Sequence, residues 1–129
     1  MRSTVSAFFT AIALSLAVTA HAAETKPFDQ ATFQALQAAG KPVLIDVYAD
    51  WCPTCKAQEP IVSELLTRPQ FAGYTRLKVN FDTQKNVRRE FGVSQQSTFI
   101  VFRGGKELGR STGDTHLESI ASLLGRGVS

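Results

Sequence analysis

Residues 42–56 read PVLIDVYADWCPTCK and join a run of apolar residues to two cysteines separated by two residues. The run from Pro42 to Tyr48 is rich in β-branched and aromatic residues, a pattern typical of a strand that is covered on both faces. Pro53 directly follows Cys52, and proline suits the first turn of a helix because its missing N–H is not needed there. We therefore expect a buried strand that leads through Cys52 into a helix.

Periodicity on both sides of this stretch predicts alternating helices and strands. Asp29 is a candidate N-cap for a helix that ends at Gly40, because Phe33, Leu36 and Ala39 follow it at helical spacing. Further along the chain we expect strands over 77–81, 98–102 and 106–111, and helices over 86–91 and 117–124. Such alternation predicts the α/β class, with a central sheet and helices on both of its faces.

The composition limits the class of protein. The chain has 129 residues, enough for one domain, and its 43% hydrophobic residues are ordinary for a globular protein. Two cysteines are too few for a disulfide-stapled mini-protein or a four-thiolate zinc site. The formal charge of +3 is spread along the chain, which argues against a nucleic-acid partner.

The first 22 residues have the layout of a secretory signal peptide. Arg2 is followed by an apolar run of 12 residues over 7–18, and then by small residues at Ala20 and Ala22, so we expect cleavage near Ala22. The alternative is a retained membrane anchor, but the run is shorter than the ~20 residues of a spanning helix. Residues 23–129 would then form one exported domain, located in the periplasm if the source is a Gram-negative bacterium.

Both cysteines lie where redox chemistry is favoured. A sulfur at a helix N-terminus faces unpaired backbone N–H groups and the positive end of the helix dipole, and both favour thiolate over thiol. Cys52 is thus the candidate nucleophile, and Cys55, one turn further, the candidate resolving thiol. The alternatives are a structural disulfide, a metal site that would have only His116 beyond the cysteines, and two unconnected buried cysteines.

The stretch over 44–56 resembles the active-site segment of the thioredoxin family. Its residues around Trp51, with Lys56 and Glu59 after the second cysteine, most resemble the periplasmic C-terminal domain of the membrane thiol:disulfide interchange protein. Similar matches occur at 78–82 (KVNFD), 91–93 (FGV), 104–106 (GGK) and Gly113. The resemblance implies a thioredoxin-like fold with a mixed sheet of four or five strands. Four are possible because residues 23–28 are short for the family's first strand.

The resemblance also implies roles for three residues near the cysteines. Asp46 corresponds to a buried carboxylate beneath the second cysteine, and a buried carboxyl group without a partner has a raised pKa and can accept the proton of Cys55. Lys78 matches a lysine that approaches this carboxylate, the alternative being a solvated strand lysine. Glu59 could tune the site, the alternative being an ordinary surface residue of a helix.

Substrate contacts are expected from the cysteine segment and from a loop that faces it. Trp51 would shield the nucleophile and offer an apolar docking surface, unless it simply packs in the core. The family carries a cis-proline before a threonine in the facing loop, and here Ser97 stands in its place. We expect either a trans Gln96–Ser97 bond with a reshaped loop or a strained cis bond, which costs about 2.5–4 kcal/mol. The expected substrate-binding residues are Trp51, Pro53, Thr54, Gln96, Ser97 and Thr98.

The sequence therefore predicts an exported thiol–disulfide oxidoreductase that serves as a periplasmic disulfide reductant. It would take electrons from a membrane donor, pass them to oxidised periplasmic proteins, and need no cofactor beyond its Cys52–Cys55 disulfide. A monomer is the default at this size. One alternative is a non-enzymatic module for soft-metal binding or thiol delivery in cofactor maturation, because Ser97 replaces the proline that blocks metal approach. A partner-binding domain with an idle cysteine pair is another.

Overall fold

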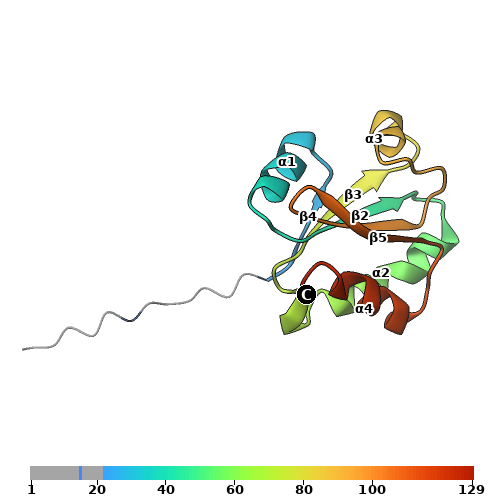
Figure 1. Ribbon diagram of the computed structural model, residues 1–129. Helices are drawn as coiled ribbons and strands as arrows, with labels where there is room; N and C mark the ends of the chain where they lie inside the picture. Colours follow the sequence, from blue (N-terminus) through green and yellow to red (C-terminus); the bar gives the residue numbers. More distant parts are fainter. Residues whose placement is uncertain (1–14, 16–21) are drawn as a thin grey trace, which may run out of the picture.

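The computed structural model describes residues 15 and 22–129. Within residues 24–125 it has a five-stranded sheet with helices on both faces (Figure 1). The strands are β1 (Glu24–Pro27), β2 (Val43–Tyr48), β3 (Thr75–Asn80), β4 (Thr98–Arg103) and β5 (Lys106–Thr112). The helices are α1 (Gln30–Ala38), α2 (Pro53–Leu65), α3 (Lys85–Glu90) and α4 (Leu117–Gly125), with a short 3-10 turn, η1, over Pro69–Phe71.

The sheet has the strand order β1-β3-β2-β4-β5. β1 and β2 pair with β3 in parallel, whereas β4 runs antiparallel to both β2 and β5. The expected α/β fold with a mixed sheet is confirmed, and the four-strand alternative is wrong. All four residues of β1 are exposed, so this strand has no hydrophobic pattern and is held by its backbone pairing with β3.

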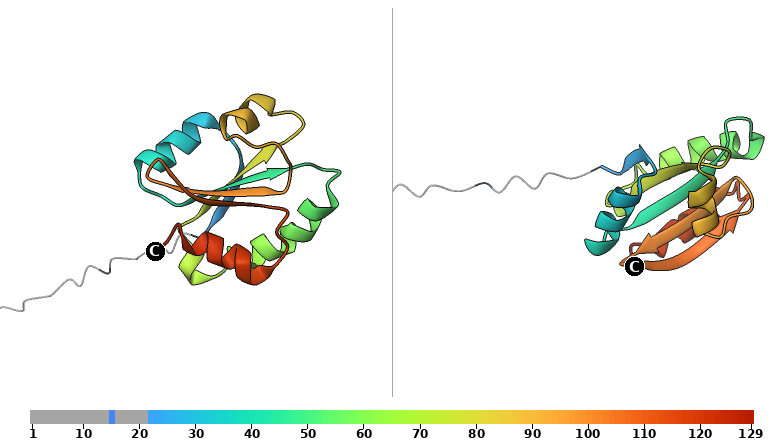
Figure 2. Two further views of the ribbon diagram at one scale, coloured as in Figure 1. Left: turned by 45° about the vertical axis from the view of Figure 1, so that its right-hand side comes forward. Right: turned by 90° about the horizontal axis from the view of Figure 1, so that it is seen from above.

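Helices α1 and α3 cover one face of the sheet, and α2 and α4 cover the other (Figures 1 and 2). Successive residues of β2 alternate between these two layers. Ile45 and Val47 pack in the cluster that includes Phe33 of α1, whereas Leu44 packs with Val62 of α2. Because side chains two residues apart share a face, Asp46 is directed with Leu44 toward α2.

The predicted signal peptide lies outside the described residues, apart from positions 15 and 22. Within the part of the chain that the structure describes, no helix is long and apolar enough to cross a membrane.

Candidate active site

Cys52 occupies the N-cap of α2, as the sequence predicts. Its backbone is extended, with φ −84° and ψ 111°, and Pro53 begins the helix behind it. The Cys52 Sγ accepts a hydrogen bond from the backbone N–H of Cys55 over 3.1 Å. A backbone donor at the positive end of a helix dipole is an arrangement that stabilises negative charge on a sulfur.

The two cysteines are not joined by a disulfide here, and they differ in burial. The Cys52 residue is only 1% exposed, whereas Cys55 is partly exposed. Burial of its sulfur and the hydrogen bond with Cys52 raise the pKa of Cys55 to about 11, although backbone groups of Ala49 and Ser97 act in the opposite direction. Cys55 is therefore a thiol at neutral pH and needs a proton acceptor before it can attack a disulfide.

A pocket of about 230 Å³ opens beside Cys55 and contains a candidate acceptor. Asp46, which is only 3% exposed, lines the same pocket. The other lining residues are Tyr48, Ala49, Asp50, Lys56, Glu59 and Lys78. The structure thus brings Asp46, Glu59 and Lys78 together with Cys55, as the resemblance implies.

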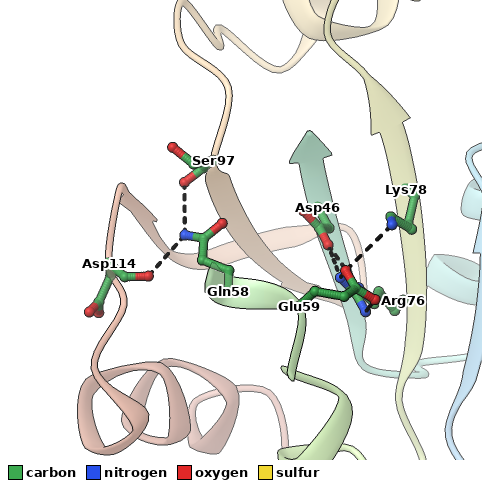
Figure 3. A network of polar contacts seen from close by, with 7 residues as sticks. All are labelled: Asp46, Gln58, Glu59, Arg76, Lys78, Ser97 and Asp114. Atoms are coloured by element: carbon green, nitrogen blue, oxygen red, sulfur yellow. Dashed lines mark hydrogen bonds and ion pairs between the residues drawn. The ribbon is translucent and has the colours of Figure 1, made fainter. Parts of the chain in front are cut away.

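Asp46 is buried but has a charged partner, Arg76. Arg76, which is 2% exposed, donates from Nε to Asp46 Oδ2 over 2.8 Å and makes a second contact to that oxygen through Nη2 (Figure 3). Burial raises the pKa of Asp46, and the guanidinium opposes this rise. Arg76 was not a predicted site residue: the strand expected here began at residue 77, and the β2–β3 register places Arg76 beside Leu44.

Lys78 is paired with Asp46 in that register, yet its ammonium bonds elsewhere. Its Nζ lies 3.5 Å from Glu59 Oε2 and 4.4 Å from the centre of the Tyr48 ring. Glu59 also accepts hydrogen bonds from Arg76, at 3.1 Å to Oε1 and 2.6 Å to Oε2. These hydrogen bonds lower the pKa of Glu59, so this residue belongs to the charge network rather than to an ordinary helix surface.

The surface beside the cysteines is partly apolar. The Trp51 residue is 57% exposed, which excludes the core-packing alternative, and its Nε1 donates to Asp82 Oδ2 over 2.8 Å. Pro53 is exposed and Thr54 is half-buried on the first turn of α2. Contact of these residues with a substrate stays a prediction.

The loop that faces the cysteines follows the first of the two expected forms, with a trans Gln96–Ser97 bond. No peptide bond in the described residues is cis, so the Gln96–Ser97 bond is trans and the cis alternative is wrong. Ser97 instead has φ 57°, in the left-handed region, which costs a non-glycine residue about 1–2 kcal/mol. Its hydroxyl donates to the Gln96 carbonyl over 2.6 Å. Gln96 is half-buried, and Thr98 Oγ1 fastens the loop by donating to the Gln95 carbonyl over 2.9 Å.

Gln58 holds this loop and was missed from the sequence. The residue is 2% exposed, and its Nε2 donates to the carbonyl oxygens of Ser97 and Asp114 over 3.3 Å and 2.9 Å (Figure 3). A signal was available, because Gln58 precedes Val62 and Leu65 at helical spacing on the buried face of α2. A polar residue on such a face generally has a specific hydrogen-bond partner.

A resident metal would need ligands beyond the two thiols. Among residues 22–129, no group of three or more His, Cys, Asp or Glu side chains is arranged to hold an ion. The soft-metal alternative therefore rests on Cys52 and Cys55 alone and stays a prediction.

A buried strand that leads through a two-cysteine turn into a helix, on a sheet of this order, defines a thiol–disulfide exchange protein of the α/β class. The thioredoxin family model matches residues 24–126, and the chain belongs to the thioredoxin family.

Relatives and solved structures agree with this assignment. The chain is 47% identical to Trxlp from Edwardsiella tarda EIB202, whose crystal structure matches with a TM-score of 0.75 over 79% of this chain and 97% of that one. It is 34% identical to thioredoxin from Chlamydia muridarum over 84 residues, covering 65% of this chain and 80% of the relative. Thioredoxin-like protein 1 from Schizosaccharomyces pombe is 38% identical over 69 residues, and this chain spans only 24% of its length.

Proposed function

We propose that the chain is an exported thiol–disulfide oxidoreductase that reduces disulfides of periplasmic proteins. The observation that carries the exchange chemistry is the Cys52 sulfur at the N-cap of α2, where it accepts the Cys55 N–H. Thiolate is the attacking species in disulfide exchange, and this position favours it. The exposed indole of Trp51 next to the nucleophile supplies an apolar surface for a protein substrate.

The first step is attack of the Cys52 thiolate on a substrate disulfide. The substrate S–S bond breaks, a mixed disulfide with Cys52 forms, and the first substrate sulfur leaves as a thiolate that takes a proton from solvent. Because the nearly covered Cys52 must reach a substrate sulfur, we expect the surrounding side chains to shift when the substrate docks.

The second step is resolution by Cys55. Its thiol gives a proton to Asp46 through the pocket that both residues line, and the resulting thiolate attacks Cys52. The mixed disulfide breaks, the Cys52–Cys55 disulfide forms, and the second substrate sulfur leaves as a thiolate that takes a proton from solvent. Two electrons have then passed from the protein to its substrate, and a donor must return them before the next turnover.

The reducing direction and the periplasmic location rest on the sequence. The residues around Trp51 and Glu59 resemble a reductive periplasmic domain, and residues 1–22 resemble a signal peptide. A membrane-bound thiol donor is the partner that such a domain requires. Members of this fold range from roughly −270 mV for reductants to roughly −120 mV for oxidants.

Insulin reduction by dithiothreitol tests the exchange activity. The wild type should accelerate precipitation of the insulin B chain, and Cys52→Ser should abolish the acceleration. Activity that persists in Cys52→Ser would refute exchange at this site. Equilibration of the pair with a glutathione buffer tests the direction, since a potential near the oxidising end would refute the reductant assignment.

A further inference from the structure

We propose that Arg76 is a positioning residue for the resolving step: it binds Asp46 and Glu59 at once and holds the Asp46 carboxylate in its charged, proton-accepting form beside Cys55. This inference rests on the proposed exchange function and concerns how its second step is controlled. Its basis is the set of contacts that one guanidinium makes between the sheet and α2 (Figure 3).

Arg76 is placed for this role by its strand. It lies on β3 with its side chain toward α2, and it is almost fully buried, as is Asp46. Nε donates to Asp46 over 2.8 Å, Nη1 to Glu59 over 3.1 Å, and Nη2 contacts both carboxylates. A planar guanidinium has five donors in a fixed fork and can bind two carboxylates together, whereas the single ammonium of a lysine cannot reproduce this geometry.

Among the cationic side chains near Asp46, Arg76 is the one that bonds to it directly. Lys78, the nearest alternative, bonds to Glu59 rather than to Asp46. On the β4 side, Asp46 is paired with the apolar Phe99. The other titratable or charged groups that line the pocket come from β2, the following loop and α2, and they are Tyr48, Asp50, Cys55, Lys56 and Glu59.

Loss of Arg76 and loss of Glu59 should act on Asp46 in opposite directions. Without the guanidinium, desolvation would raise the pKa of Asp46 further, and the protonated carboxyl group could not take the proton of Cys55 at neutral pH. Without the Glu59 charge, a repulsive neighbour disappears and Arg76 is bound by Asp46 alone, so the pKa of Asp46 should fall. A purely structural role for Arg76 would not produce shifts of opposite sign.

The test uses Arg76→Met, Arg76→Lys and Glu59→Gln, with Arg68→Met as the matched control. Arg68, three residues after the end of α2, pairs with Glu64 of that helix and lies outside the pocket. Two quantities are measured against pH: the carbon-13 chemical shift of the Asp46 carboxyl group, and the rate at which a preformed mixed disulfide at Cys52 is resolved.

In Arg76→Met we expect the pH midpoint of the Asp46 titration and that of the resolution rate each to rise by about 1–3 pH units, the range typical for loss of a neighbouring opposite charge. In Arg76→Lys the rise should be smaller, in Glu59→Gln the midpoints should fall, and in Arg68→Met they should match the wild type. An unchanged Asp46 titration in Arg76→Met overturns the proposal. If Arg76→Met fails to fold, Glu59→Gln provides the test. A midpoint of the Asp46 titration that is unchanged or higher in Glu59→Gln would overturn the proposal. The chemical-shift titration needs no exchange activity, so its result is separate from failure of the wild type to reduce insulin.

Discussion

The side-chain amide of Gln58 donates to the backbone carbonyl of Ser97 over 3.3 Å and thereby joins the cysteine-bearing helix to the loop that faces it. The same nitrogen donates to the Asp114 carbonyl over 2.9 Å, and the Ser97 carbonyl also accepts the Gly113 N–H at 2.9 Å. Two loops that are distant in the sequence are thus fastened to α2 one helical turn after Cys55. A change in this buried amide should alter both the stability of the domain and the position of the substrate loop.

Gln58→Leu should lower the free energy of unfolding by about 1–3 kcal/mol, because it leaves the partly buried carbonyl of Asp114 without its side-chain donor. The KM for a protein disulfide should rise, since the loop would lose a tether to the helix. Urea unfolding and insulin-reduction kinetics measure the two effects. Gln34→Leu, on the exposed surface of α1, is the control and should change stability by less than about 0.5 kcal/mol. Equal effects of the two substitutions would contradict the prediction.

Ser97→Gly should leave stability within about 1 kcal/mol of the wild type, because relief of the left-handed backbone offsets the greater flexibility of glycine in the unfolded chain. Ser97→Val should be the less stable variant, since a β-branched side chain is poorly compatible with φ 57°. Thermal unfolding of the two variants checks this order. Ser94→Val, at an exposed position of the same loop, should be close to neutral. A valine variant as stable as the glycine variant would contradict the observed backbone.

In Cys52→Ala, the remaining thiol of Cys55 should react slowly with iodoacetamide at neutral pH. Thiolate is the reactive form, so the rate should rise about tenfold per pH unit while the thiol is mostly protonated. Burial of the sulfur remains in this variant and is the largest cause of a pKa near 11 in the wild type. We therefore expect the rate to keep rising above pH 9.0, the ordinary value for the thiol. An alkylation rate that reaches a plateau below that pH would show that burial does not raise the pKa of Cys55.

Glu59 and Asp46 should influence acid stability with opposite signs. The pKa of Glu59 is lowered by Arg76, so its contribution is present above the ordinary value of 4.5 and is lost as pH falls through its lower folded value. The pKa of Asp46 is raised, mainly by burial, so its contribution declines as pH rises from 3.8 through its folded value. Urea unfolding at a series of pH values should show a shallower loss of stability below pH 4.5 in Glu59→Gln than in the wild type. If the free energy of unfolding falls equally steeply with pH in the variant and the wild type, the lowered pKa of Glu59 would be contradicted.

Trp51→Ala should raise the KM for protein disulfides while changing stability by less than about 1 kcal/mol, because the indole is 57% exposed. Trp51→Phe keeps an aromatic surface but loses the hydrogen bond to Asp82, and should retain most of the activity. Insulin reduction compared with reduction of a small disulfide measures the docking contribution. An equal loss on both substrates would place Trp51 in the chemistry rather than in docking.

The central strand, the cysteine helix and the α/β class could be predicted because their signals are local. The apolar run over 42–48 and Pro53 after Cys52 are visible in consecutive residues, and the structure places β2 and α2 there. β1 was uncertain because residues 23–28 are short for the family's first strand, and its four residues, all exposed, carry no hydrophobic pattern. Its existence depends on backbone pairing with β3, some 50 residues away in the chain.

Consecutive residues were enough to predict that two cysteines share one strand-to-helix turn, that Asp46 lies on a buried strand, and that Ser97 replaces a family proline. Which side chains these residues contact became visible only in the folded domain. In the strand register, the backbone of Lys78 is paired with that of Asp46. The side chains pair differently: Arg76 bonds to Asp46, and Lys78 bonds to Glu59, which approaches from α2. Ser97 takes a left-handed trans backbone where Gln58 reaches its carbonyl. The partner of a long polar side chain depends on its distance from groups on other elements and on how far both are buried. Neither quantity can be read from neighbouring residues in the sequence.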